Sequence, residues 1–217
     1  MMGSDDFAAA RRAMVEQQLA ARGIADPRVL AVMGAVPREA FIPADLAGSA
    51  YEDRALPIDA AQTISQPYIV ALMSESLQVE PHHRVLEIGT GTGYQTAVLA
   101  RLAAQVYSIE RIESLSAAAQ RVLARLGVAN VSFRVGDGTL GWPEAAPFDR
   151  IMVTAAAPKL VDPLVAQLAE GGRMVIPLGE DAAQQLVTIE RAGVTTIERP
   201  LIPVRFVRLI GASGHPE

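Results

Sequence analysis

The chain has 217 residues, and half of them are hydrophobic, which is enough apolar material for the core of one domain. Its net charge of −5 disfavours non-specific nucleic-acid binding, and the absence of cysteine excludes disulfides and thiolate metal sites. Only 5% of the residues are aromatic, so Ala, Val, Leu and Ile must fill the core.

The N-terminal region predicts a small helical addition and no targeting segment. Acids stand at positions 5 and 6, where a signal peptide would carry positive charge, and no apolar run approaches the roughly 20 residues needed to span a bilayer. We therefore expect a cytoplasmic protein with no membrane partner. Asp5 to Arg22 is typical of an amphipathic helix ending at Gly23, and Asp26-Pro27 predicts the start of a second helix. We expect residues 1–61 to pack on a core formed by residues 62–217.

From Arg84 onward, strand and helix patterns alternate. The expected strands lie near 84–88, 105–110, 131–135, 148–154, 172–178, 184–190 and 204–209, and the expected helices near 93–103, 112–126 and 160–169. Such alternation predicts an α/β fold, a Rossmann-like doubly wound sheet that is mostly parallel with helices on both faces. The last strands follow one another with little helix between them, which predicts an antiparallel edge.

Residues 85–94 read Val-Leu-Glu-Ile-Gly-Thr-Gly-Thr-Gly-Tyr, a short apolar strand followed by alternating glycines. Glycines after a strand allow a sharp turn and a close approach to a ligand. The third glycine comes one residue earlier than in the dinucleotide fingerprint, and an acid precedes the turn. This pattern resembles motif I of class I methyltransferases, which use S-adenosylmethionine and release S-adenosylhomocysteine. The resemblance implies that the cofactor is bound by Glu87, Gly89, Thr90, Gly91 and Gly93.

Two further acids follow the next two strands. Glu110 lies about 20 residues after Gly89, the offset expected for an acid that binds ribose hydroxyls, and it could also cap the following helix. Arg111 is counted with it as a cofactor residue. In class I methyltransferases an acid after the third strand bonds the adenine amino group, and the matching residues are Asp137 and Gly138. From the residues alone, Asp137 is equally well explained as a turn aspartate between glycines.

A segment upstream of motif I narrows the resemblance. Residues 62–68 read Gln-Thr-Ile-Ser-Gln-Pro-Tyr and closely resemble the signature of protein-L-isoaspartate O-methyltransferases. Similar segments appear in the expected order over roughly residues 10 to 212. They are Val36 to Phe41, Val106 to Arg111, Phe148 to Pro158, Gly171 to Gly179, and Pro203 to Val207.

The family implies a protein-repair reaction. A methyl group passes from S-adenosylmethionine to the free α-carboxylate of an isoaspartyl residue in a damaged protein or peptide. Ser65 matches the family's active-site residue, and Gln62, Thr63, Ile64 and Val207 are the expected substrate-binding neighbours. Ser65 could instead cap the helix that begins near Pro67.

Two departures from the family pattern and two rival functions stay open. Asp59-Ala60-Ala61 stands where relatives usually carry glycines, and Ile210 stands where they usually carry threonine. The rivals are a class I methyltransferase for another small-molecule or protein carboxylate, and a module that has lost turnover. A third rival, a nicotinamide-dependent oxidoreductase, is disfavoured by the position of the third glycine and by the lack of a Tyr-x-x-x-Lys pair. No metal is expected, because His82 and His83 read as a surface loop. We expect a monomer, since no long apolar stripe is left over for an interface.

Overall fold

A seven-stranded sheet forms the centre of the molecule, with strand order β5-β4-β3-β6-β7-β8-β9. The computed structural model describes residues 3–180 and 183–216, so Met1 and Met2 of the expected N-terminal region lie outside the described residues. The strands are β3 (Arg84–Ile88), β4 (Gln105–Glu110), β5 (Val131–Val135), β6 (Phe148–Val153), β7 (Leu168–Glu180), β8 (Ala183–Ala192) and β9 (Thr195–Val204). The first five in spatial order pair in parallel, whereas β8 and β9 pair antiparallel. The predicted mixed α/β fold with an antiparallel edge is confirmed.

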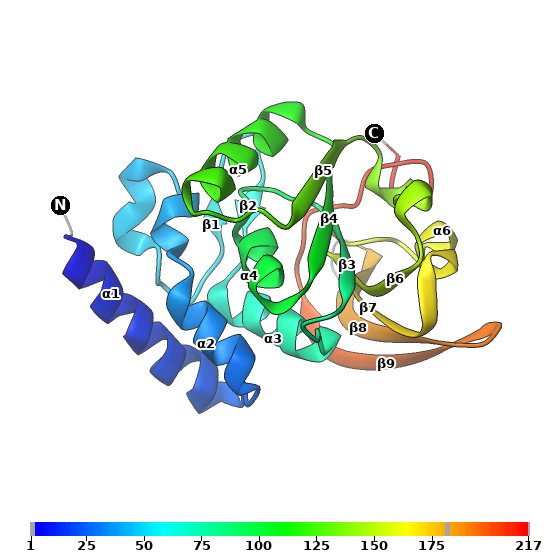
Figure 1. Ribbon diagram of the computed structural model, residues 1–217, viewed down its shortest axis with the longest axis horizontal. Coiled ribbons are helices and arrows are strands. Elements are labelled where there is room, and N and C mark those ends of the chain that lie inside the picture. Colours follow the sequence, from blue (N-terminus) through cyan, green and yellow to red (C-terminus); the bar gives the residue numbers. More distant parts are fainter. Residues whose placement is uncertain (1–2, 181–182, 217) are drawn as a thin grey trace.

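Helices cover both faces of this sheet (Figure 1). They are α1 (Ser4–Ala13), α2 (Pro27–Ala35), α3 (Pro67–Leu77), α4 (Tyr94–Leu102), α5 (Glu113–Arg125) and α6 (Asp162–Ala166). Residues of α2, α3 and α4 share one buried apolar cluster with Val85 and Val175 of the sheet. A second cluster lies around α6 and contains Leu86 and Ile151. Successive residues of β3 therefore enter opposite cores, as expected for a central strand that is buried on both faces.

The N-terminal addition joins the sheet through a small hairpin. Strands β1 (Leu56–Pro57) and β2 (Thr63–Ile64) pair antiparallel, and the predicted boundary at residues 61 and 62 falls in their turn. The predicted first helix is present, but only α1 at its start is an α-helix. It continues as a π-helix over Met14–Leu19 and as a 3-10 turn over Ala20–Arg22. It ends, as predicted, at Gly23, whose φ is +94°. None of the helices in the described ranges is both long and apolar enough to cross a membrane.

The predicted strand over 204–209 is wrong. The last strand, β9, covers Thr195–Val204 instead, because it pairs antiparallel with β8 directly after the turn at Gly193. Residues 205–209 instead cross the carboxyl ends of the parallel strands, where Ala156 and Arg208 form an isolated bridge. The predicted helix over 160–169 is also too long, since β7 already begins at Leu168.

Candidate active site

The glycine loop between β3 and α4 has the backbone that its sequence predicts. Gly89, Gly91 and Gly93 all adopt left-handed φ values, of +95°, +54° and +91°. A Cβ on Gly89 would stand 2.2 Å from the Oγ1 of Thr154, so no larger residue fits there. A Cβ on Gly91 would meet no atom, because this glycine borders open space. The loop therefore packs against Thr154, just after β6, on one side and faces a cavity on the other.

Glu110 holds this loop in place from the end of β4. Its Oε2 accepts the Gly91 N–H at 2.9 Å, and its Oε1 accepts the N–H of Ile112, the residue before α5, at 3.0 Å. Glu110 is not the cap of α5, because Ile112 holds the N-cap position and no side chain caps this helix; its bond to the Ile112 N–H instead fixes the turn before α5. Each carboxylate oxygen has a second lone pair, so Glu110 can also accept hydrogen bonds from ribose hydroxyls.

Glu87 lies behind the loop, fully buried, and lines no part of the cavity. Its Oε2 accepts hydrogen bonds from Thr96 and Ser108, each at 2.6 Å, and Ser108 also pairs with Thr90 at 2.6 Å. Burial raises the pKa of Glu87 to about 7, against the lowering effect of these hydrogen bonds. In this arrangement Glu87 supports the loop through Ser108 and Thr90.

Asp137 does not line the cavity either, but it lines an adjoining pocket that shares Arg111 and Ile210 with it. Its Oδ1 accepts the N–H and hydroxyl of Thr139 at 2.8 and 2.7 Å, and its Oδ2 accepts the N–H of Ala212 at 2.7 Å. These hydrogen bonds lower its pKa against the opposing effect of desolvation, and they fix the C-terminal segment beside the cavity. The neighbouring Gly138 does line the cavity, so the predicted adenine contact fits the backbone of Gly138 better than the side chain of Asp137.

A cavity of about 370 Å³ lies over the carboxyl ends of β3, β4 and β6. Ligands bind at this edge in open α/β sheets. Eight predicted site residues line it: Gln62, Thr63, Gly89, Gly91, Glu110, Arg111, Gly138 and Val207. Apolar side chains complete the wall: Ile88, Ile109, Ile112, Leu115, Leu209 and Ile210. A polar loop with a carboxylate on one side and aliphatic walls on the other suit S-adenosylmethionine, with its amino-acid, ribose and adenine parts.

Ser65 lies in an adjoining groove of about 450 Å³. The helix-cap alternative is excluded, because the residue before α3 is Gln66 and no side chain caps this helix. Three residues, Thr63, Thr154 and Val207, line both the cavity and the groove. Ile64 lines a small pocket that also touches Ser65 and the glycine loop. The predicted substrate residues therefore adjoin the predicted cofactor residues that line the cavity, whereas Glu87 and Asp137 do not line it.

Thr154 is the site residue that sequence reasoning missed. It follows β6, and its hydroxyl donates to the carbonyls of Ile88 and Gly89 at 2.9 and 2.8 Å. Its position just past the end of a parallel strand was the available signal, since site residues gather at that edge.

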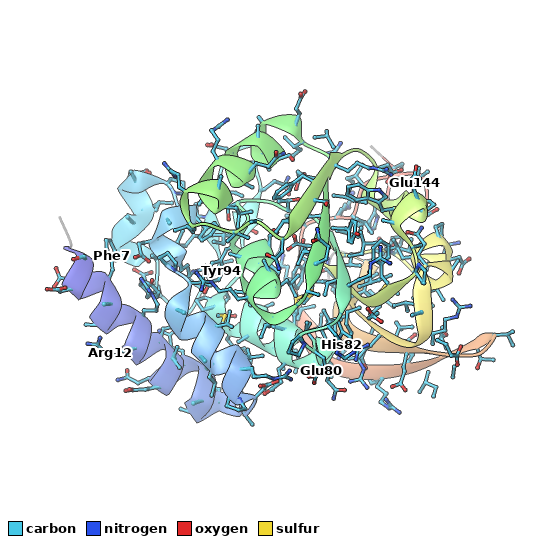
Figure 2. All side chains as sticks on the ribbon, viewed as in Figure 1. Phe7, Arg12, Glu80, His82, Tyr94 and Glu144 are labelled. Carbon is cyan, nitrogen blue, oxygen red and sulfur yellow. The ribbon has the colours of Figure 1, made fainter. Side chains whose placement is uncertain are left out.

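The prediction that both His82 and His83 lie in a surface loop needs correction, because His82 is exposed but His83 is not. His83 is buried, and its Nδ1 accepts the N–H of Glu80, while Glu80 and His82 mark that loop in Figure 2.

Comparisons with known proteins agree with this geometry. The protein-L-isoaspartate(D-aspartate) O-methyltransferase family profile matches residues 9–214. A protein-L-isoaspartate O-methyltransferase of Syntrophobacter fumaroxidans is 53% identical over 209 residues, covering 96% of this chain and 98% of its own. One from Methanoculleus marisnigri is also 53% identical, over 98% of this chain and 97% of its own.

Solved structures agree as well. A protein-L-isoaspartate O-methyltransferase structure is 31% identical with a TM-score of 0.83, covering 94% of this chain and 67% of that one. A Plasmodium falciparum structure assigned to the same activity, in complex with S-adenosyl-L-homocysteine, is 29% identical with a TM-score of 0.80, covering 92% and 98%. The chain therefore belongs to the protein-L-isoaspartate(D-aspartate) O-methyltransferase family of S-adenosylmethionine-dependent protein-repair enzymes.

Proposed function

We propose that the groove around Ser65 binds the free α-carboxylate of an isoaspartyl residue and presents it to the methyl donor held in the neighbouring cavity. The observation that carries this proposal is the shared boundary, where Thr63, Thr154 and Val207 line both spaces. Methyl transfer needs the two reacting groups in line and in contact, and a common wall provides that geometry. Gln62, Ile64 and Val207 then shape the substrate side.

On the cofactor side, we assign binding to the backbone of Gly89, Gly91 and Gly138 and to the carboxylate of Glu110. Arg111 lines the same cavity. Thr90, Gly93 and Glu87 act from behind by holding the loop.

The chemistry explains why positioning dominates in this site. A carboxylic acid with a pKa of about 4 is ionised at neutral pH, so it is a nucleophile without help from a base. When bound, S-adenosylmethionine supplies an activated methyl group on its sulfonium. The chain's own residues then have two tasks, which are to orient the acceptor and to exclude water. A hydroxyl at Ser65 suits the first task because it can donate a hydrogen bond to a carboxylate oxygen.

Labelled S-adenosylmethionine and a matched pair of peptides test the assignment of Ser65. The isoaspartyl peptide should be labelled and the aspartyl peptide should not. Ser65→Ala should lower kcat/KM for the isoaspartyl peptide roughly 10- to 100-fold, the value of a hydrogen bond to a charged group. Ser114→Ala, at an exposed site on α5, is the matched control. Parental kcat/KM in Ser65→Ala would refute the role given to Ser65.

We further propose that the enzyme acts as a cytoplasmic monomer on isoaspartyl proteins. In the described ranges the exposed large apolar side chains form two small pairs, Val135 with Leu140 at and after the end of β5 and Val194 with Ile197 in the β8–β9 hairpin. Pairs of this size do not make a dimer interface. Sedimentation at several concentrations would test the monomer, and cell fractionation would test the compartment.

A further inference from the structure

Arg38 is a fully buried guanidinium in the Val36 to Phe41 segment, which carries part of the family resemblance but has no role in the proposed site so far. Its Nη2 donates to the carbonyl of Ser65 at 2.7 Å, and its Nε donates to the carbonyl of Ala50 at 2.8 Å. Its Nη1 is buried without a hydrogen-bond partner among the described residues. Arg38 thus links the N-terminal addition directly to the residue assigned to the acceptor carboxylate.

Arg38 does not belong to an ion pair in the described part of the chain. Across residues 3–180 and 183–216, no carboxylate is paired with it. A buried cation without a counter-ion is costly, and burial accordingly lowers the pKa of Arg38. Two carbonyl hydrogen bonds and the ring of Tyr94, whose centroid lies 4.8 Å from the guanidinium carbon, offset part of this cost.

Tyr94 connects the same guanidinium to the glycine loop. It is the first residue of α4, directly after Gly93, and Figure 2 shows it between α4 and the N-terminal helices. Its ring packs edge-on against the ring of Phe41, with the two ring centroids 5.6 Å apart, and its hydroxyl lies 3.8 Å from the sulfur of Met33 on α2. Arg38 therefore lies where the N-terminal addition, the cofactor loop and the Ser65 segment meet.

We propose that Arg38 is the positioning residue for Ser65, holding its backbone so that its hydroxyl faces the acceptor, and that its unpaired charge favours an anionic acceptor in the groove. The inference rests on the role proposed above for Ser65. An arginine serves here because its planar fork reaches two carbonyls at once while keeping a fixed positive charge. Arg38 itself lines neither the cavity nor the groove, so its charge acts on an acceptor carboxylate from behind the Ser65 segment rather than by direct contact.

Two substitutions separate the geometry from the charge. Arg38→Met removes the charge and keeps most of the apolar stem, and we expect kcat/KM for the isoaspartyl peptide to fall about 100-fold, as for a misplaced reacting group. Arg38→Lys keeps the charge but cannot span both carbonyls, and we expect a smaller loss. The affinity for S-adenosylhomocysteine should change by less than about 3-fold in both, since Arg38 lines no part of the cofactor cavity.

Arg11→Met is the matched control. Arg11 belongs to the same N-terminal addition and bonds Tyr51 and Glu39 without contacting residues 62–66. Arg11→Met should change neither kcat/KM for the isoaspartyl peptide nor the affinity for S-adenosylhomocysteine, once both are corrected for the amount of folded protein. A loss in Arg38→Met that is equalled by Arg11→Met, or that falls equally on S-adenosylhomocysteine affinity, would mean that Arg38 serves the fold alone and would overturn the proposal.

A double-mutant cycle with Ser65→Ala tests whether Arg38 acts through Ser65, using Arg38→Lys because it keeps the buried charge. If it does, adding Arg38→Lys to Ser65→Ala should cost much less than it costs in the parent enzyme. Losses that simply multiply would refute the link while leaving the role of Ser65 intact. Parental activity in Ser65→Ala alone would refute the role of Ser65 and, with it, this inference.

Discussion

Glu87 is a fully buried carboxyl whose Oε1 has no hydrogen-bond partner in the described part of the chain. Its Oε2 accepts from two hydroxyls, and these bonds do not outweigh the cost of burying a charge, so its pKa is raised to about 7. The unfolded chain binds fewer protons than the folded one between the ordinary glutamate pKa, about 4.3, and 7. The stabilising effect of protonated Glu87 is therefore complete at low pH and is lost as the pH rises through 7.

Glu87→Gln should remove this pH dependence. The amide oxygen can accept both hydroxyls, and the residue is neutral at every pH. We expect the stability of the variant relative to the parent to rise by about 3 kcal/mol from pH 4.5 to pH 8, the free-energy equivalent of the shift. Urea unfolding over pH 5–8 measures most of this rise.

Glu198→Gln, at an exposed site on β9, is the control and should show no such rise. A stability difference between Glu87→Gln and the parent that stays flat over this range would contradict the account of Glu87.

At the scale of elements, the turn between β1 and β2 shows what the replacement of the usual glycines by Asp59-Ala60-Ala61 does to the backbone. Ala60 and Ala61 have φ values of +57° and +54°, in the left-handed region that favours glycine. They occupy the two central positions of a turn in which the N–H of Gln62 bonds the carbonyl of Asp59 at 3.3 Å. A β-turn with positive φ at both central positions is of the type dominated by glycine, asparagine and aspartate, which is why glycine is favoured there. The chain therefore carries backbone strain next to Gln62 and Thr63 of the site.

Replacing each of these alanines by glycine should relieve that strain. We expect Ala60→Gly and Ala61→Gly each to raise the free energy of unfolding by about 1 kcal/mol, because the left-handed penalty exceeds the entropy cost of glycine. The same substitution at Ala118, inside α5, should lower it by about 1 kcal/mol. Urea denaturation of the three variants measures the difference in sign. Destabilisation at all three positions would show that the turn is unstrained.

The sequence predicted the elements whose signals are local. Parallel strands such as β3 and β4 are short apolar runs that end at a glycine or an acid. Their ends were predicted correctly because these marker residues stand at the strand ends in the sequence itself. The path of residues 204–209 was not predictable in this way. Val204, Phe206 and Leu209 suit an extended chain, but whether such a chain joins the sheet depends on which edge β8 offers and on its turn at Gly193.

The same distinction holds in the site. The spacing of Gly89, Gly91 and Glu110 is enough to predict them, and all three line the cavity. Thr154 reaches the glycine loop from a distant part of the chain. Arg38 lay in a recognised segment, yet its bond to Ser65 depends on how the N-terminal addition packs against the core. Contacts of this kind exist only in the folded chain.

At the scale of the whole molecule, the N-terminal addition and the sheet share one hydrophobic core. A single buried cluster contains Met14 and Met33 from the addition, Leu99 from α4, and Val175 from the sheet. Met33 is fully buried and touches the hydroxyl of Tyr94. A core that crosses residues 61 and 62 predicts that both parts unfold together as one cooperative unit.

Met33→Ala tests this cooperativity, because the single tryptophan, Trp142, packs against the second cluster beside Tyr107, outside the core that contains Met33. Truncating a buried methionine costs about 2–5 kcal/mol. If the molecule unfolds as one unit, the urea midpoint reported by Trp142 fluorescence should fall as far as the midpoint reported by far-ultraviolet circular dichroism. Val194→Ala, at the exposed tip of the β8–β9 hairpin, should leave both midpoints unchanged. An unchanged Trp142 midpoint, with early loss of helical signal in Met33→Ala, would instead show that the addition unfolds alone. The bond from Arg38 to the Ser65 carbonyl would then be lost while the sheet stays folded.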